Sequence, residues 1–511
     1  MPASRPNLLF IMTDQHRLSA VGAYGPTPCR TPNIDRLAAE GVLFERAYTV
    51  CPVCSPARGT ILTGLYPHGH GVTTNIHEIG CSVHELPDQP GLLPRRLQAA
   101  GYAVGYTGKW HLGTDLKQME IFPGANAPSL PSTIGFEGQD FPGHGGYGCN
   151  YPQYKQWLAA RGLAHRVKPW DEPTPMVRHS GILDVPANAT VPAYLVDCSI
   201  EMIERFTARR QPFFIALNFW GPHEPYYATQ EFVDAYRGVA IPEWPEFRWA
   251  SRQTPGPHHM KIHPGHETTP WEHWETIVRY YYAATSMLDQ QIGRLYAYLQ
   301  KTGRLENTVI VFTADHGESL GSHGGLVDKG WRHFEDTHRI PFILRLPDGA
   351  GAGTRRPELV SLADVYPTVL DLAGASWDRG AAHGRSLLPL LNGDAAPWRE
   401  GVVTEFLGLG NVGTFMKTVR MGSLKYGCNM PWADELYDLE TDPHETRNLI
   451  DDPAYAGAIV RMRRWLEEWM RQTNDPALRM YRWRYGRDLA QPGGGVPAVP
   501  FANEDGAVRA G

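Results

Sequence analysis

Three short apolar runs, each closed by polar residues, constrain the fold of this chain more than any other feature. They read NLLFIMTD from Asn7, FFIALNFWGPH from Phe213 and TVIVFTADH from Thr308. Uninterrupted apolar runs of this length are typical of strands buried on both faces of a parallel sheet. Segments with helical spacing lie between them, such as residues 31–41 and 275–303. The alternation predicts an α/β fold with a large, mainly parallel sheet sandwiched by helices.

The polar residues that close these runs predict the place of a functional site. The first run ends in Asp14 and Gln15, the second is followed by His223, and the third by Asp315 and His316. Ligands of α/β sheets gather at the carboxyl ends of the strands. We therefore expect these side chains to meet at one edge of the sheet.

The chain has 511 residues, which is more than one core of ordinary size supports. From about Trp398, short alternating segments predict a small antiparallel sheet, and a helix is expected over about residues 453–472. We expect a large α/β domain over residues 1–395, an α+β subdomain over 396–480 and an irregular tail over 481–511. The aperiodic tail fits either disorder or an arm that contacts another subunit.

Charge and composition narrow the class of protein. A net charge of -6 without a basic block argues against nucleic-acid binding. The apolar run Leu8–Met12 is too short for a signal peptide or a membrane span, so we expect a cytoplasmic protein with no membrane partner. The 7 cysteines, an odd number, fit reduced thiols better than a disulfide framework.

The stretch CPVCSPARGTILTG, from Cys51 to Gly64, allows several interpretations. A redox C-x-x-C pair would open a helix, whose N-terminus lowers a thiol pKa. A structural zinc ion needs two more ligands, usually a second close pair, whereas Cys29 and Cys81 are isolated. A buried cysteine with neither role would fill the core. The residues after Cys54 add a further interpretation.

The sequence Cys54-Ser-Pro-Ala-Arg58 resembles the C-x-P-x-R signature of the sulfatase family, whose cysteine is oxidised to formylglycine. Other segments resemble family landmarks in the right order: MTDQ from Met12, GKWHLG from Gly108, GPHEPY from Gly221, FTADHGESLGSHG from Phe312, a following lysine, and ELYDLETDPHETRNL from Glu435. They span about residues 5 to 450. The resemblance implies the fold of the alkaline phosphatase superfamily, in agreement with the parallel sheet, and leaves Cys51 a structural role.

The resemblance also implies a sulfuric ester hydrolase and a role for each matching residue. The implied metal ligands are Asp14, Gln15, Cys54, Asp315 and His316. The implied catalytic residues are Cys54, Arg58, Lys109, His111, His223 and Lys329, and the implied sulfate contacts are Asn75, Lys109, His223 and Lys329. The hydrate of formylglycine would attack sulfur, and its second hydroxyl, deprotonated by His111, would expel sulfate. His223 would donate to the sulfate or protonate the leaving alcohol or phenol.

The spacing of two residue pairs agrees with these roles. Arg58 lies four residues after Cys54, so a helix that begins at the cysteine would place both on one face. Lys109 and His111 alternate around Trp110 and would point the same way from an extended segment.

Two of the implied ligands depart from many sulfatases, which carry Asp at Gln15 and Asn at His316. Calcium prefers an all-oxygen shell, and a nitrogen ligand favours manganese or a similar ion. One divalent ion is therefore expected, either Mn²⁺ or Ca²⁺.

Ala57, where serine is usual, makes the motif similar to that of choline sulfatases and phosphonate monoester hydrolases. The latter carry a threonine-rich segment at the position of Lys109 and His111, so this pair favours sulfate over phosphonate or phosphodiester. The expected substrate is an aryl or small alkyl sulfate. A phosphonate monoester or phosphodiester hydrolase, a promiscuous enzyme, a non-catalytic relative and a metal- or redox-binding protein are the alternatives. The expected partners are a formylglycine-generating or equivalent maturation enzyme and further copies of the chain in a homo-oligomer, a dimer or tetramer.

Overall fold

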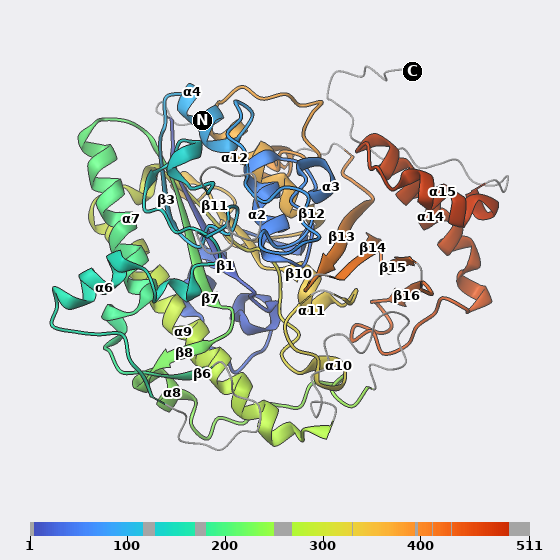
Figure 1. Cartoon of the computed structure of the whole chain (residues 1–511), viewed down its shortest axis with the longest axis horizontal. Coiled ribbons are helices and arrows are strands. Elements are labelled where there is room, and N and C mark those ends of the chain that lie inside the picture. Colours follow the sequence, from blue (N-terminus) through green and yellow to red (C-terminus); the bar gives the residue numbers. More distant parts are fainter. Residues whose placement is uncertain are drawn as a thin grey trace.

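The computed structural model describes residues 5–115, 128–168, 180–249, 268–329, 331–393, 397–410, 412–430 and 432–489. A nine-stranded sheet with the order β10-β2-β11-β9-β1-β7-β3-β4, to which β12 adds beside β2, forms its centre (Figure 1). β1 (Asn7–Asp14) lies between β7 (Phe213–Pro222) and β9 (Thr308–Ala314), parallel to both. β3 (Ala103–Gly108) extends the parallel part beside β7.

One side of the sheet is mixed in direction. β11 (Phe342–Arg345) runs antiparallel to both β9 and β2 (Val42–Tyr48), and β12 (Thr354–Ser361) is parallel to β2. The prediction of a mainly parallel sheet is thus confirmed for the strands that carry the apolar runs.

Alternate residues of β1 face two different layers of helices. Leu8 and Phe10 lie in a hydrophobic cluster with residues of α2 (Cys54–Thr63), α4 (Leu93–Ala99) and α12 (Val365–Ala373). Leu9 and Ile11 lie in a second cluster with residues of α1 (Pro32–Ala39), α7 (Val191–Ala208) and α9 (Trp271–Lys301). Because successive side chains of a strand point to opposite faces, an unbroken apolar run buries both faces at once.

The C-terminal part forms the small antiparallel sheet that the sequence predicts. Its strands are β13 (Gly401–Leu409), β14 (Val412–Met421), β15 (Leu424–Met430) and β16 (Glu435–Asp438), and α14 (Ala456–Gln472) follows (Figure 1). Phe406, Val419 and Trp465 belong to the same hydrophobic cluster as Phe10. The two sheets therefore share one continuous core.

The prediction of an irregular tail from residue 481 is wrong for its first part, because α15 (Leu478–Leu489) continues through it. Tyr481 and Tyr485, four residues apart on one face, are buried. Their hydroxyls donate to the Arg463 carbonyl at 3.0 Å and to Asp434 at 2.7 Å. Residues 490–511 of the tail lie outside the described part of the chain.

The remaining elements are the short edge strands β4 and β10 of the central sheet, a separate three-stranded sheet of β5, β6 and β8, and several short helices. They are α3 (Pro67–His70), β4 (Glu137–Gly138), α6 (Pro152–Ala159), β5 (Val167–Lys168), β6 (Ser180–Leu183), β8 (Tyr226–Thr229), α8 (Gln230–Tyr236), α10 (Ser322–Gly325), α11 (Glu335–His338), β10 (Arg339–Ile340) and α13 (Leu388–Asn392). Among the described residues, no helix combines the length and the apolar character needed to cross a membrane.

Candidate active site

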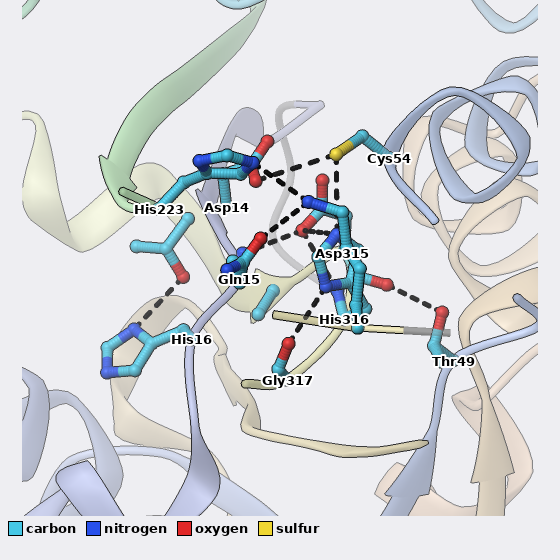
Figure 2. Close-up of polar contacts among 12 residues, drawn as sticks. Asp14, Gln15, His16, Thr49, Cys54, His223, Asp315, His316 and Gly317 are labelled. Atoms are coloured by element: carbon cyan, nitrogen blue, oxygen red, sulfur yellow. Dashed lines mark hydrogen bonds and ion pairs between the residues drawn. The ribbon is translucent and has the colours of Figure 1, made fainter. Parts of the chain in front are cut away.

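The polar residues that close β1, β7 and β9 meet at one edge of the sheet, as the sequence predicts (Figure 2). Asp14 is the last residue of β1, and Asp315 directly follows β9. The Asp315 carboxylate accepts hydrogen bonds from the backbone N–H of Gln15 at 3.0 Å and of His316 at 2.9 Å. These bonds join the ends of the neighbouring strands.

Cys54, the first residue of α2, also lies at this edge. Its sulfur lies 3.4 Å from His316 Nε2, 3.7 Å from Asp14 Oδ1 and 3.4 Å from Lys109 Nζ. Figure 2 shows the sulfur pointing toward the two strand ends. Burial raises the pKa of the thiol, but Lys109, Lys329 and His316 outweigh burial and hold the pKa well below its ordinary value. Position 54 therefore favours a negatively charged group.

Arg58 lies one helical turn after Cys54 and joins the two buried carboxylates. Its Nη2 is 2.7 Å from Asp14 Oδ2 and 3.0 Å from Asp315 Oδ2, and Nη1 donates to the Lys109 carbonyl at 2.9 Å. Burial alone would raise the pKa of Asp14, but Lys109, His223 and Arg58 together lower it. The expected position of Arg58 on the face of Cys54 is confirmed, and its contacts are with the carboxylates.

The potential ligand atoms at this edge that do not bind Arg58 are suited to hold a divalent ion. Ligand atoms of Asp14, Cys54, Asp315 and His316 all lie within 4.8 Å of one another, and all four residues are buried. His316 donates its Nδ1–H to the Gly317 carbonyl at 2.9 Å, so that Nε2 is the ring nitrogen that faces the cluster. Carboxylate oxygens, an imidazole nitrogen and the group at position 54 together are a donor set that divalent ions accept.

Gln15 and Lys329 form the next layer around the cluster. Lys329 Nζ donates to Gln15 Oε1 at 2.5 Å and to His223 Nε2 at 2.8 Å. His223 Nδ1 donates to the Glu224 carbonyl at 2.7 Å, which leaves Nε2 as the acceptor. Gln15 Nε2 donates to Glu318, whose pKa burial and Asp328 raise to about 7. Lys329 and His223 thus meet beside the predicted metal ligand Gln15.

Lys109 and His111 reach the site by a different backbone path from the predicted one. β3 ends at Gly108, and His111 has a left-handed φ of 54°, so the segment is a turn instead of an extended strand. A Cβ atom on Gly108 would overlap the Asn218 carbonyl oxygen, so this turn requires glycine. Lys109 Nζ is 2.7 Å from Asp14 Oδ2. Burial lowers the pKa of His111 to about 3, which keeps its imidazole neutral at neutral pH.

Asn75 lies beside the start of α2. Its Oδ1 accepts from the backbone N–H and the hydroxyl of Ser55, both at 3.3 Å. These contacts position the residue after Cys54, and the part of Asn75 in substrate binding stays a prediction.

The sequence did not single out three further residues of the site. Glu318 binds Gln15, His77 Nδ1 lies 3.4 Å from His111 Nε2, and the ring of His144 contacts those of His111 and His223. His77 follows Asn75 by two residues, and Glu318 follows His316 by two, so both lie in segments that already carried a landmark. His144 lies in a glycine-rich loop that has no periodicity to place it.

Cys51 takes no part in the cluster of ligand atoms found among the described residues. It is buried, and all 7 cysteines are free thiols. Burial and Glu405 raise the pKa of Cys51 well above its ordinary value, which is the opposite of a reactive redox thiol. The structure therefore gives no support to a Cys51–Cys54 disulfide or zinc pair.

Comparison with known proteins places most of the chain in one family. The sulfatase family model matches residues 6–375, and the model of the N-sulphoglucosamine sulphohydrolase C-terminal region matches residues 321–472. The sulfatase YidJ of Escherichia coli, itself uncharacterised, is 30% identical over 94% of this chain and 90% of its own length. The N-acetylglucosamine-6-O-sulfatase of Bacteroides thetaiotaomicron is 30% identical over 92% of this chain and 88% of its own.

The similar proteins also include a choline-sulfatase and a phosphonate monoester hydrolase, the two groups whose motif the segment Cys54–Arg58 resembles. The choline-sulfatase of Rhizobium meliloti is 28% identical over 89% of this chain and 84% of its own. The crystal structure of the phosphonate monoester hydrolase of Agrobacterium radiobacter superposes with a TM-score of 0.75 at 25% identity, over 92% of this chain and 96% of that one. The resemblance to the alkaline phosphatase superfamily is confirmed, and this chain belongs to the sulfatase family of sulfuric ester hydrolases.

Proposed function

We propose that this chain hydrolyses aryl or small alkyl sulfate monoesters, with a formylglycine formed from Cys54 as the nucleophile and one divalent ion beside it. The observation that carries the proposal is the position of Cys54. Its sulfur lies within 3.4–3.7 Å of a predicted sulfate-binding lysine and of two predicted metal ligands. In the mature protein, the hydrated aldehyde would supply the attacking oxygen and the ion would supply Lewis acidity.

The lysines of the site stabilise negative charge. Lys109 and Lys329 are both buried and both lower the pKa of a thiol at position 54. The same positive charge would stabilise an anionic nucleophile and the oxygens of a sulfate group, because charge interactions strengthen where water is excluded. Arg58 would not reach the substrate, since the carboxylates and the Lys109 carbonyl occupy its terminal nitrogens.

Two histidines are placed to move protons. His223 Nε2 accepts from Lys329 Nζ, so it would take a proton from this ammonium group and pass it to the leaving oxygen. His111 Nδ1 has no hydrogen-bond partner among the described residues, and its neutral imidazole would accept a proton from the hydroxyl of residue 54. Both rings contact that of His144.

An apolar pocket beside His223 supports an aryl or small alkyl leaving group. His223 contributes to its wall, together with Tyr147, Trp220, Tyr227, Leu195 and Met287. A wall of rings and aliphatic side chains favours an apolar group over a carbohydrate, which needs several hydrogen-bonding partners.

The donor set favours Mn²⁺ over Ca²⁺. His316 Nε2 is a nitrogen ligand fixed toward the cluster, whereas calcium takes six to eight oxygen ligands. We expect the His316→Asn variant to shift the preference toward Ca²⁺, measured as the ratio of kcat/KM with each metal restored to the stripped protein. An unchanged ratio would contradict a ligand role for His316.

The first test is the mass of the tryptic peptide from Ala47 to Arg58, made in a host that contains a formylglycine-generating enzyme. We expect a mass loss that corresponds to the conversion of one thiol to an aldehyde, with Cys51 still open to alkylation. Two alkylated thiols in that host would contradict the proposal.

The phosphonate monoester or phosphodiester alternative makes a different prediction about substrates. The site stabilises similar pentacoordinate transition states of sulfur and phosphorus, so side activity is expected. Because Lys109 and His111 are present, we expect kcat/KM for nitrophenyl sulfate to exceed that for phenylphosphonate by at least about tenfold, which corresponds to ~1.4 kcal/mol. The reverse order would make the phosphonate reaction the main activity.

A further inference from the structure

A second group of potential ligands lies among segments that the proposed reaction does not use. It consists of Glu246, after α8, His323, in α10, and Asp336, in α11, and their ligand atoms lie within 4.8 Å of one another. The exposed fractions of Glu246 and His323 are 3% and 2%. This group shares no residue with the cluster of Asp14, Cys54, Asp315 and His316. The group is therefore distinct from the candidate active site.

The hydrogen bonds of His323 determine which ring nitrogen faces the group. Its Nε2 lies 3.0 Å from the backbone carbonyl of His444, and a carbonyl only accepts, so Nε2 carries the proton. Burial lowers the pKa of His323 to about 4, so that Nδ1 holds a lone pair at neutral pH. Nδ1 has no hydrogen-bond partner among the described residues and faces Asp336 Oδ2 at 3.8 Å. A lone pair thus faces a carboxylate oxygen.

The two carboxylates each use one oxygen elsewhere and turn the other toward His323. Arg17 Nη2 lies 2.8 Å from Asp336 Oδ1 and 3.4 Å from Glu246 Oε1. The second oxygens, Asp336 Oδ2 and Glu246 Oε2, have no hydrogen bond within the described part of the chain. Burial and the Asp336 carboxylate raise the pKa of Glu246, as expected for two anions that share one guanidinium. Three acceptor atoms, His323 Nδ1, Asp336 Oδ2 and Glu246 Oε2, therefore converge, and none of the three accepts a hydrogen bond within the described part of the chain.

His444 adjoins this group through Glu246. Its Nδ1 is 3.1 Å from Glu246 Oε2, and its side chain is 45% exposed, so it closes the group on the solvent side. The ring of His323 is held in place by Phe334, on which it stacks with a centroid distance of 3.5 Å. Two imidazoles and two carboxylates form a donor set that zinc and manganese ions accept, at about 2.0–2.2 Å for zinc.

We propose that Glu246, His323, Asp336 and His444 bind a second divalent ion of the Zn²⁺ or Mn²⁺ type. The ion would lie between His323 Nδ1 and the free carboxylate oxygens of Asp336 and Glu246. It would neutralise the negative charge of the two carboxylates that Arg17 alone does not neutralise. It would tie the segment after α8 and the loop after β16 to α10 and α11, which follow the strand end that carries Asp315. Its role would be structural, since no nucleophile lies in the group.

The experiment uses the Asp14→Asn/Asp315→Asn variant, whose proposed active-site ion is removed. The full chain is stripped with a chelator and dialysed against Zn²⁺ or Mn²⁺, and its metal content and melting temperature are measured. We expect one ion per chain and a higher melting temperature with metal. Adding His323→Phe, which keeps a ring on Phe334, or Glu246→Gln should abolish both effects.

His338→Phe is the matched control, because His338, in α11, is a second buried histidine whose ring nitrogens have no hydrogen-bond partner among the described residues. It should retain the ion. A background variant that binds no ion would overturn the proposal. A bound ion that survives both His323→Phe and Glu246→Gln would also overturn it, since the ion would then lie elsewhere. Neither result depends on whether Cys54 is modified.

Discussion

Replacing Cys54 by serine is expected to lower kcat/KM for nitrophenyl sulfate by at least about 10³-fold, on the scale of losses seen when a nucleophile is removed. Serine would retain an oxygen near Lys109 and could accept a sulfuryl group from one substrate molecule. The resulting serine sulfate ester has no second hydroxyl that could expel sulfate. We therefore expect at most one phenolate released per chain, followed by no further turnover.

The matched control is Cys51→Ala, since Cys51 is buried three residues earlier and takes no part in the ligand cluster of the described residues. It should keep kcat/KM within about threefold while costing some stability through the lost side-chain volume. Single-turnover and steady-state assays of nitrophenolate release distinguish the two variants. Steady turnover by Cys54→Ser within about tenfold of the original chain would exclude formylglycine as the nucleophile.

The sequence predicts the residues of this site better than it predicts the backbone that presents them. Asp14 and Asp315 could be placed because a parallel sheet brings the carboxyl ends of its strands together, whatever the loops do. Arg58 could be placed because its position relative to Cys54 depends only on helical spacing within one segment. Lys109 and His111 reach the site through a turn that depends on Gly108 and on the neighbouring Asn218 carbonyl, which belongs to another strand. Alternation along the chain contains no information about that contact.

The group around His323 was beyond prediction for the same reason. Its members come from segments that are far apart in the chain, and each residue alone looks like an ordinary surface or core side chain. The helix α15 is easier to predict from the sequence. The spacing of Tyr481 and Tyr485 is that of a helix face, whereas the residues after 490 are rich in glycine and proline.

Replacing Lys417 by methionine is expected to lower the free energy of unfolding by about 3–5 kcal/mol, the usual cost of breaking a buried ion pair from one side. Lys417 Nζ, in β14, lies 2.6 Å from Glu405 Oε2 of β13 and 2.6 Å from Asp475 Oδ2 after α14. His68 of α3 completes the network, with its Nδ1 2.9 Å from Glu405 Oε2. All four side chains are at most 3% exposed, so water cannot replace the lost ammonium group.

The network joins the large domain to the C-terminal sheet, because His68 follows α2 and the carboxylates come from the second sheet and the end of α14. Urea unfolding followed by tryptophan fluorescence measures the loss. Lys301→Met, at the exposed end of α9, is the control and should change stability by less than about 0.5 kcal/mol. A Lys417→Met variant as stable as this control would show that the network contributes nothing to the union of the two sheets.

We expect the difference in unfolding free energy between the original chain and Lys417→Met to depend on pH, because the network contains an ionised carboxylate. Burial alone would raise the pKa of Glu405, but Lys417 and His68 outweigh it and hold the pKa below the ordinary value of 4.5. A carboxyl group with a depressed pKa in the folded state stabilises the protein above its unfolded pKa and loses that contribution as the pH falls. We therefore expect the stability difference between the original chain and Lys417→Met to be full at pH 7 and to narrow below about pH 4.5. A difference that stays constant as the pH falls below about 4.5 would mean that Glu405 is already protonated in the native network at neutral pH.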